Sequence, residues 1–171
     1  MGIFNKLKKL SENIEDKTKD LQKKLNEISQ DEGDYEDGEG TKKTYFENGK
    51  LETIAHFENG KIHGKFKTYF ENENIKIEAA YKNGVKNGPF KQYFENGKIE
   101  IDSAYKEDLS HGPYKTYFEN GQLKVDSSFK EDKWDGPYKS YYENGQLRTD
   151  TVYKKDKRDG PYKSYYENGQ L

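Results

Sequence analysis

Three histidines are the side chains of this 171-residue chain best suited to acid–base chemistry or metal binding. His63 and His111 each precede a glycine and occupy one position of a repeating pattern, which Asn87, Asp135 and Asp159 fill in other copies. Asn, Asp and His are the residues other than glycine that best tolerate a left-handed backbone. We therefore expect His63 and His111 to serve a turn rather than a reaction.

The remaining candidates offer no better catalytic or metal site. His56 has no second histidine beside it, and the chain contains 0 cysteines. Glutamates such as Glu119 recur once per copy, which is typical of a solvated row rather than of a paired acid and base. No glycine-rich segment leads into the Lys-Ser or Lys-Thr of a phosphate-binding loop. The sequence predicts no enzyme, no cofactor and no metal.

The elements around these residues recur at a step of 24 residues without insertion or deletion. The step is kept by a tyrosine, an asparagine and an aliphatic residue, at Tyr45, Tyr69, Tyr93, Tyr117, Tyr141 and Tyr165, at Asn48, Asn72, Asn96, Asn120, Asn144 and Asn168, and at Leu51, Ile75, Ile99, Leu123, Leu147 and Leu171. A fixed period of this length indicates a repeat architecture in which each unit contacts its neighbours.

The composition suits a folded protein with a thin core. Charged residues make up 36% and hydrophobic residues 30%, but aromatic residues reach 15%, which is untypical of a disordered chain. The net charge of −2 argues against a nucleic-acid partner. No apolar run is long enough to span a bilayer or act as a secretion signal. We expect a cytoplasmic protein.

Each repeat reads as one antiparallel hairpin. Pro113–Phe118 is rich in strand-forming residues, Asn120-Gly121 is a strong hairpin signal, and Leu123–Lys130 forms the returning strand. A two-residue Asn-Gly turn would pair Phe118 with Leu123. Alternation then puts Tyr114, Thr116, Phe118, Leu123, Val125, Ser127 and Phe129 on one apolar face, and charged residues with one tyrosine column on the other. Trp134 falls in the outer turn and is expected to face water.

These patterns predict an all-β fold, an elongated single-layer antiparallel meander of 24-residue hairpins over residues 41–171. The apolar face would form an aromatic groove that binds a protein partner. Its expected contact residues are aromatic: Phe66, Phe70, Phe90, Phe94, Tyr114, Phe118, Phe129, Tyr138, Tyr142 and Tyr153.

Residues 1–30 are expected to form an amphipathic helix with an apolar stripe. The stripe contains Ile3, Leu7, Leu10, Ile14, Leu21, Leu25 and Ile28. This helix could cover the apolar face of the sheet, self-associate or bind a partner. It could also contact an anionic membrane surface through Phe4, Lys6, Leu7, Lys8 and Lys9.

Both ends of the array have their own features. Residues 31–40 combine six acidic residues with three glycines and predict a flexible linker. The last copy is as regular as the others, and the sequence stops inside a hairpin. Either the array continues in a longer parent protein, or an open edge is left for self-association.

From residue 40 onward the repeat resembles the bacterial variant of the MORN repeat, Gly-x-Tyr/Phe-Lys-x-Tyr-Tyr/Phe-Glu-Asn-Gly-x-Leu. It is carried by Gly88–Ile99, Gly112–Leu123, Gly136–Leu147 and Gly160–Leu171, with weaker copies from Gly40 and Gly64. In the weaker copies Lys42 replaces the aromatic residue and Glu73 replaces the turn glycine. The resemblance implies a twisted sheet of hairpins with a groove.

The resemblance also implies a function in scaffolding and protein binding. Many bacterial proteins with this repeat carry the label of YwqK-family antitoxin, so it implies an antitoxin-like or immunity-like role. Lipid binding is proposed for some eukaryotic members, which makes a peripheral membrane scaffold the alternative. Tyrosine rows would also suit carbohydrate in a secreted relative, for which this sequence shows no signal.

Overall fold

The computed structural model describes residues 35, 36 and 38–171, and every strand among them belongs to one antiparallel sheet. Residues Asp34–Leu171 form one compact unit. The all-β meander of hairpins predicted from the sequence is confirmed. The predicted helix over residues 1–30, with its candidate contacts Phe4, Leu7, Leu10, Ile14, Leu21 and Leu25, lies outside the described residues.

The strands follow the period of the sequence. Their bounds are β1 Tyr35–Glu36, β2 Glu39–Tyr45, β3 Leu51–Glu58, β4 Lys61–Tyr69, β5 Ile75–Lys82, β6 Val85–Tyr93, β7 Ile99–Lys106, β8 Leu109–Tyr117, β9 Leu123–Lys130, β10 Lys133–Trp134, β11 Gly136–Tyr141, β12 Leu147–Lys154, β13 Lys157–Arg158 and β14 Lys163–Ser164. Strand β1 and the start of β2 fall within the segment predicted as a linker.

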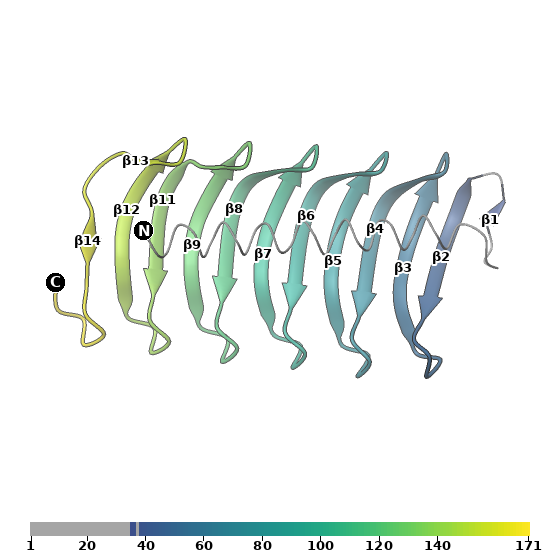
Figure 1. Cartoon of the computed structure of the whole chain (residues 1–171), viewed down its shortest axis with the longest axis horizontal. Helices are drawn as coiled ribbons and strands as arrows, with labels where there is room; N and C mark the ends of the chain where they lie inside the picture. Colours follow the sequence, from purple (N-terminus) through teal and green to yellow (C-terminus); the bar gives the residue numbers. More distant parts are fainter. Residues whose placement is uncertain (1–34, 37) are drawn as a thin grey trace. The chain divides into compact units, whose positions relative to one another are not determined.

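The strands lie side by side in the order of the sequence, and tight turns line one edge while longer loops line the other (Figure 1). In the later repeats the long strand is interrupted. Strands β10 and β11 both pair with β9, and β13 and β14 both pair with β12.

The Asn-Gly loops are one residue longer than predicted. In the loop after β8, the Phe118 N–H donates to the Gln122 carbonyl (2.8 Å) and the Gly121 N–H donates to the Phe118 carbonyl (2.8 Å). Three residues therefore form the loop, and Gly121 alone in it has a positive φ, 94°. The ladder shifts beside it, so Tyr117 rather than Phe118 pairs with Leu123. The prediction of a two-residue turn was wrong because a type I′ turn needs positive φ at both central residues.

Two-residue turns occur at the opposite edge. Glu58 pairs with Lys61 across Asn59 and Gly60, whose φ angles are 51° and 70°. Later copies place Glu131 (53°) and Asp132 (62°) in the same conformation. These positive φ angles at both positions are those of a type I′ turn.

The left-handed backbone predicted at His63 and His111 is not found, because neither is among the described residues with positive φ. The glycine after each one has it instead, with φ of 85° at Gly64 and 96° at Gly112. Near Gly64 the pairing of β3 with β4 also changes register. The glycine, and not the histidine before it, therefore adopts the left-handed backbone beside the register shift.

Hydrogen bonds join the tight turns of successive repeats. The Asp132 N–H donates to the Ser110 carbonyl (3.1 Å), and the Ser110 N–H donates to Asp132 Oδ1 (2.6 Å). Asp108 makes the same two contacts with Lys86 (2.9 and 2.7 Å). The carboxylate in each later turn thus accepts a backbone hydrogen bond from the preceding repeat.

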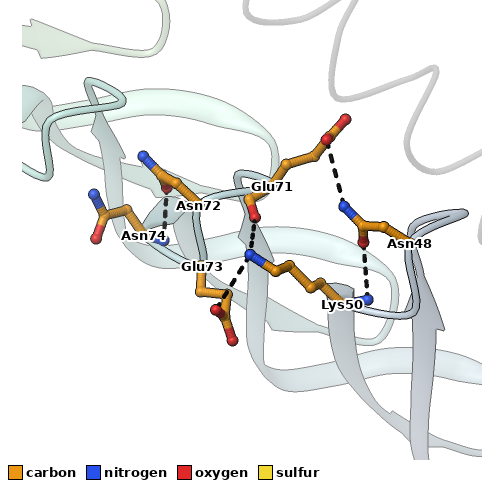
Figure 2. Close-up of polar contacts among 6 residues, drawn as sticks. All are labelled: Asn48, Lys50, Glu71, Asn72, Glu73 and Asn74. Atoms are coloured by element: carbon orange, nitrogen blue, oxygen red, sulfur yellow. Dashed lines mark hydrogen bonds and ion pairs between the residues drawn. The ribbon is translucent and has the colours of Figure 1, made fainter.

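The asparagine column joins the longer loops. Asn72 Oδ1 accepts a hydrogen bond from the Asn74 N–H (2.9 Å), while its Nδ2 donates to the Glu95 carbonyl of the next repeat (2.9 Å). Asn48 accepts from the Lys50 N–H in the same way (3.0 Å), as Figure 2 shows. One asparagine therefore closes its own loop and contacts the following one, which explains why the sequence repeats it at each step.

Candidate interaction surface

One face of the sheet carries three rows of side chains that run across the strands. The middle row contains Lys42, Ala55, Phe66, Ala79, Phe90, Ser103, Tyr114, Ser127, Tyr138 and Thr151. The inner row, nearer the asparagine loops, contains Thr53, Thr68, Ile77, Gln92, Ile101, Thr116, Val125, Ser140 and Thr149. The outer row, nearer the tight turns, contains Phe57, Ile62, Tyr81, Lys86, Tyr105, Ser110, Phe129, Trp134, Tyr153 and Arg158. We call this face the aromatic face.

The middle row alternates large and small side chains. Phe66, Phe90, Tyr114 and Tyr138 lie on β4, β6, β8 and β11, whereas the small residues Ala55, Ala79, Ser103 and Ser127 lie on β3, β5, β7 and β9. Neighbouring strands are about 4.8 Å apart. The small positions are therefore separated by about 9.6 Å, with an aromatic ring between successive ones.

Rings pack edge to face between the middle and outer rows. The Phe66 and Tyr81 centroids are 5.5 Å apart, and those of Phe90 and Tyr105 are 5.4 Å apart. Such pairs contribute about 0.5–1.5 kcal/mol beyond the burial of their area. These contacts fix the rings that the repeat supplies once per strand.

Trp134 completes the largest ring cluster. It lies 4.0 Å from Phe129, 5.5 Å from Tyr114 and 5.6 Å from Tyr138, measured between ring centroids. The indole is only 7% exposed. The expectation that Trp134 faces water was wrong, because β10 pairs with β9 and brings Trp134 opposite Phe129.

The structure brings some of the predicted contact residues together and separates others. Phe66, Phe90, Tyr114 and Tyr138 are buried in the middle row, and Phe129 and Tyr153 contact Tyr114 and Tyr138 (5.1 and 5.5 Å). Phe70, Phe94, Phe118 and Tyr142 are half-buried next to the loops. There Lys76, Lys124 and Arg148 place their charges 5.5, 5.3 and 5.5 Å from the rings of Phe70, Phe118 and Tyr142. A binding role for these ten residues remains a prediction.

Polar groups are also buried on the aromatic face. The hydroxyls of Thr68, Thr116, Ser127 and Thr151 have no hydrogen-bond partner within the described part of the chain. Leaving a buried hydroxyl unpaired costs about 1–3 kcal/mol. Three of these four residues lie in the second half of the array, so that half could meet hydrogen-bonding groups of a ligand.

Burial also changes the titration of the tyrosines in these rows. It raises the pKa of Tyr138 to about 12, with a further contribution from Tyr153. The pKa of Tyr114 rises for the same main reason. These phenols are therefore neutral at physiological pH and act as apolar rings with hydrogen-bonding hydroxyls.

Two lysines belong to the rows of the aromatic face in the first half of the array. Lys42 stands in the middle row, where its amine lies 5.1 Å from the Phe57 ring centroid, and burial lowers its pKa. Lys86 stands in the outer row, with its amine 4.1 Å from the centroid of Tyr105. The first half of the aromatic face thus carries two cations among its apolar side chains and the polar inner-row residues Thr53, Thr68 and Gln92.

The opposite face carries a ladder of alternating charge that the sequence analysis missed. Its members follow one another in register from strand to strand: Lys67, Glu78, Lys91, Asp102, Lys115, Asp126, Lys139, Asp150 and Lys163. Lys67 Nζ lies 2.7 Å from Glu78 Oε1, and Lys139 Nζ lies 3.6 Å from Asp150 Oδ2. The 24-residue recurrence of both charges was visible in the sequence and could have revealed the ladder.

Tyr93 links the tyrosine column to this ladder. Its hydroxyl donates to Glu78 Oε2 (2.7 Å). Burial and this hydrogen bond raise the pKa of Tyr93 to about 12, while Lys67 and then Tyr93 lower the pKa of Glu78. The predicted charged face with one tyrosine column is therefore found at this position.

The histidines do not gather into a site. His63 Nδ1 lies 2.9 Å from Glu58 Oε2, and His56 Nδ1 lies 3.4 Å from Thr41 Oγ1. Within residues 35–36 and 38–171, no group of three His, Asp or Glu side chains could hold a metal ion. The same residues contain no helix long and apolar enough to cross a membrane.

The sheet of joined hairpins, with one ring-lined face and one charged face, defines a single-sheet repeat protein. Comparison with family models identifies the repeat: the MORN repeat variant matches residues 38–59, 62–83, 86–107, 110–131, 134–155 and 158–171. The chain belongs to this family of MORN repeat proteins. No catalytic family is identified along it, and no curated protein matches its sequence.

Proposed function

We propose that this protein is a non-catalytic cytoplasmic scaffold that binds a helical segment of a partner protein on its aromatic face. The observation that carries the proposal is the division of the sheet into one ring-lined face and one face of paired charges. An apolar sheet face requires a second layer, and the described residues supply none.

The middle row favours an α-helix as the ligand. Its small positions recur about every 9.6 Å, and side chains seven residues apart on a helix are separated by about 10.5 Å. An amphipathic helix lying across the strands could therefore place one apolar side chain over each small position of the middle row. Hydroxyl groups on that helix could pair with Thr116 and Thr151 in the later repeats. In an antitoxin-like role, the helix would belong to the toxin.

A photocrosslinking experiment tests which face binds the partner. Benzoylphenylalanine replaces Tyr153 on the aromatic face, and in a matched variant it replaces Tyr117, which occupies the position of Tyr93 in the next repeat. Illumination in cells should link a partner to the first variant and not to the second. Equal crosslinking from both positions, or from Tyr117 alone, would contradict the proposal.

The partner identified in this way is then purified, and its affinity is measured by calorimetry. Ser127→Leu enlarges one small position of the middle row, and Asp126→Asn changes the neighbouring residue on the charged face. We expect Ser127→Leu to weaken binding by about tenfold or more, since inserting extra methylene groups into a packed contact costs about 1–3 kcal/mol. Asp126→Asn should leave binding unchanged. Unaltered affinity in Ser127→Leu would refute the aromatic face as the site.

A further inference from the structure

A row of prolines and smaller side chains runs beside the charge ladder on the opposite face. Each proline lies two residues from a ladder lysine, and each of the other members lies two residues from a ladder acid. In strand order the row contains Ala80, Pro89, Ala104, Pro113, Ser128, Pro137, Val152 and Pro161. The four prolines are exposed, and Val152 is 38% exposed. This proline row adds an apolar strip to the charged face.

The later rungs of the charge ladder are more open than the first. Lys67 Nζ and the Tyr93 hydroxyl each lie 2.7 Å from an oxygen of Glu78. The following Nζ–Oδ2 distances are 3.9, 3.7 and 3.6 Å, for Lys91–Asp102, Lys115–Asp126 and Lys139–Asp150. These distances exceed that of a hydrogen bond, and the six side chains are between 34% and 45% exposed. Their charged groups can therefore pair with groups above the sheet.

We propose that this face binds a second copy of the chain back to back. The two-fold axis runs parallel to the strands, between β8 and β9, so it reverses the strand order and keeps each row opposite itself. Lys115 then faces Asp126 of the second copy. Because the charges alternate, the same axis pairs Lys91 with Asp150, Asp102 with Lys139 and Glu78 with Lys163. In the proline row it sets Pro113 over Ser128, Pro137 over Ala104, Pro161 over Ala80 and Pro89 over Val152.

The side chains of the two rows select this register. An axis on a strand would place like charges opposite each other. An axis one strand earlier, between β7 and β8, would pair opposite charges but would bring Lys65, which pairs with Ala80, into the proline row over Val152. Only the axis between β8 and β9 keeps Lys65 outside the interface while using all eight ladder members from Glu78 to Lys163.

The size and charge of the strip suit a stable dimer. Eight strands span about 38 Å, and the five residues from the proline row to the tyrosine column span about 17 Å. Two such surfaces would bury about 1,300 Å² together, which lies in the range of specific interfaces. The strip is electrically neutral, since its ladder alternates from Glu78 to Lys163. The inference goes beyond the proposed function: a back-to-back dimer places the two aromatic faces on the outside and gives the scaffold two binding faces.

Sedimentation velocity on the full chain measures the dissociation constant of the dimer. Lys115→Asp and Asp126→Lys each place like charges opposite each other across the axis and should raise this constant at least about tenfold. Lys130→Asp makes the same change of charge at the tight-turn edge and should leave it unchanged. An equimolar mixture of Lys115→Asp and Asp126→Lys restores opposite charges in the mixed dimer. The mixture should therefore associate at least about tenfold more tightly than either variant by itself.

Pro113→Arg gives a second readout if a charge reversal prevents folding, which circular dichroism would reveal. Lys65 occupies the corresponding position in an earlier repeat, so the fold accepts a long cation there, and Pro113→Arg should weaken the dimer as the reversals do. A chain that stays monomeric, a dissociation constant that none of these variants changes, or a mixture without recovery would each overturn the inference.

The crosslinking variants separate this inference from the proposed function. A crosslink from position 117 to a second copy of the chain supports the dimer, whereas a crosslink from there to another protein contradicts the aromatic face as the binding site. A monomeric chain that still crosslinks a partner from position 153 would preserve the proposed function and refute the dimer.

Discussion

Replacing Glu73 by glycine should stabilise the protein. Glu73 has a φ of 70°, and the same loop position is glycine at Gly49, Gly97 and Gly121. A left-handed backbone costs a residue with a side chain about 1–2 kcal/mol. Glycine removes this strain but gains freedom in the unfolded chain, which offsets about 0.5–1 kcal/mol.

The contact that Glu73→Gly would lose is weak. Lys50 Nζ lies 3.4 Å from Glu73 Oε2, and the two side chains are 42% and 71% exposed (Figure 2). Exposed ion pairs contribute little because water and salt screen them. Lys50 also keeps its hydrogen bond to the Glu71 carbonyl (2.9 Å). The net expected gain is therefore about 0.5–1 kcal/mol, or about 2–4 °C in melting temperature for a stabilisation of 1 kcal/mol.

Urea unfolding followed by circular dichroism measures this change. The control is Glu95→Gly, in the corresponding loop of the next repeat at a residue that lacks a positive φ. It should destabilise the protein by about 0.5–1 kcal/mol, since glycine there adds only unfolded-state freedom. If Glu73→Gly is neutral or destabilising, the ion pair with Lys50 outweighs the backbone strain and the reasoning fails.

Three further perturbations test other parts of the fold. Asp132→Ala should destabilise the protein by about 1–2 kcal/mol, because the Ser110 N–H loses its acceptor. Asp132→Gly should destabilise it less, since glycine also relieves the strain of the positive φ. Urea unfolding of both variants measures this order, and the reverse order would contradict the prediction. Gly88→Ala should destabilise the protein by about 1 kcal/mol or more beyond the loss in Gly49→Ala. A Cβ at Gly88 would lie 2.9 Å from the Ala80 Cβ, while one at Gly49 meets nothing within 4 Å. Equal losses of stability in the two variants would refute the close approach at Gly88. Tyr93 and Tyr138, whose pKa values rise to about 12, bind their protons more tightly in the folded protein. Their contribution to stability is therefore complete below about pH 10, the unfolded pKa of tyrosine, and is lost as the pH rises toward 12. Unfolding monitored against pH should show this loss, and Tyr93→Phe should reduce it.

The meander could be predicted from the sequence because its signals are local and repeated. Asn-Gly pairs, strand-forming residues and a constant period each indicate hairpins. The type of turn could not be assigned in the same way, since Asn48-Gly49 and Asn59-Gly60 are the same dipeptide in two conformations. Only Gly49 of the first pair has a positive φ, whereas both residues of the second pair do. The pairing of the strands differs beside them: the ladder shifts between Thr44 and Tyr45 next to the first pair, whereas Glu58 and Lys61 pair directly across the second.

Long-range contacts explain what else the sequence analysis missed. Asp108 tolerates its positive φ of 64°, but its hydrogen bond from the Lys86 N–H could not be predicted, because that partner lies in the preceding repeat. Trp134 follows the turn residues Glu131 and Asp132. The equivalent positions hold Ile62, Lys86, Ser110 and Arg158, so this column is not consistently apolar and did not mark Trp134 as buried. Its pairing with Phe129 across two strands makes it part of the ring cluster.

The repeats are joined at places other than the aromatic face as well. Asparagine and aspartate contacts connect them at the two edges, and paired charges cross the opposite face. Residues of the middle row can therefore differ between repeats, as Ala79 and Ser103 do, without loss of these contacts. The same separation explains how Lys42 can replace an aromatic residue in the first repeat while β2 keeps its pairing with β3. Side-chain substitutions in this row are therefore compatible with the fold, because they leave the backbone pairing of the strands and the contacts at the two edges in place.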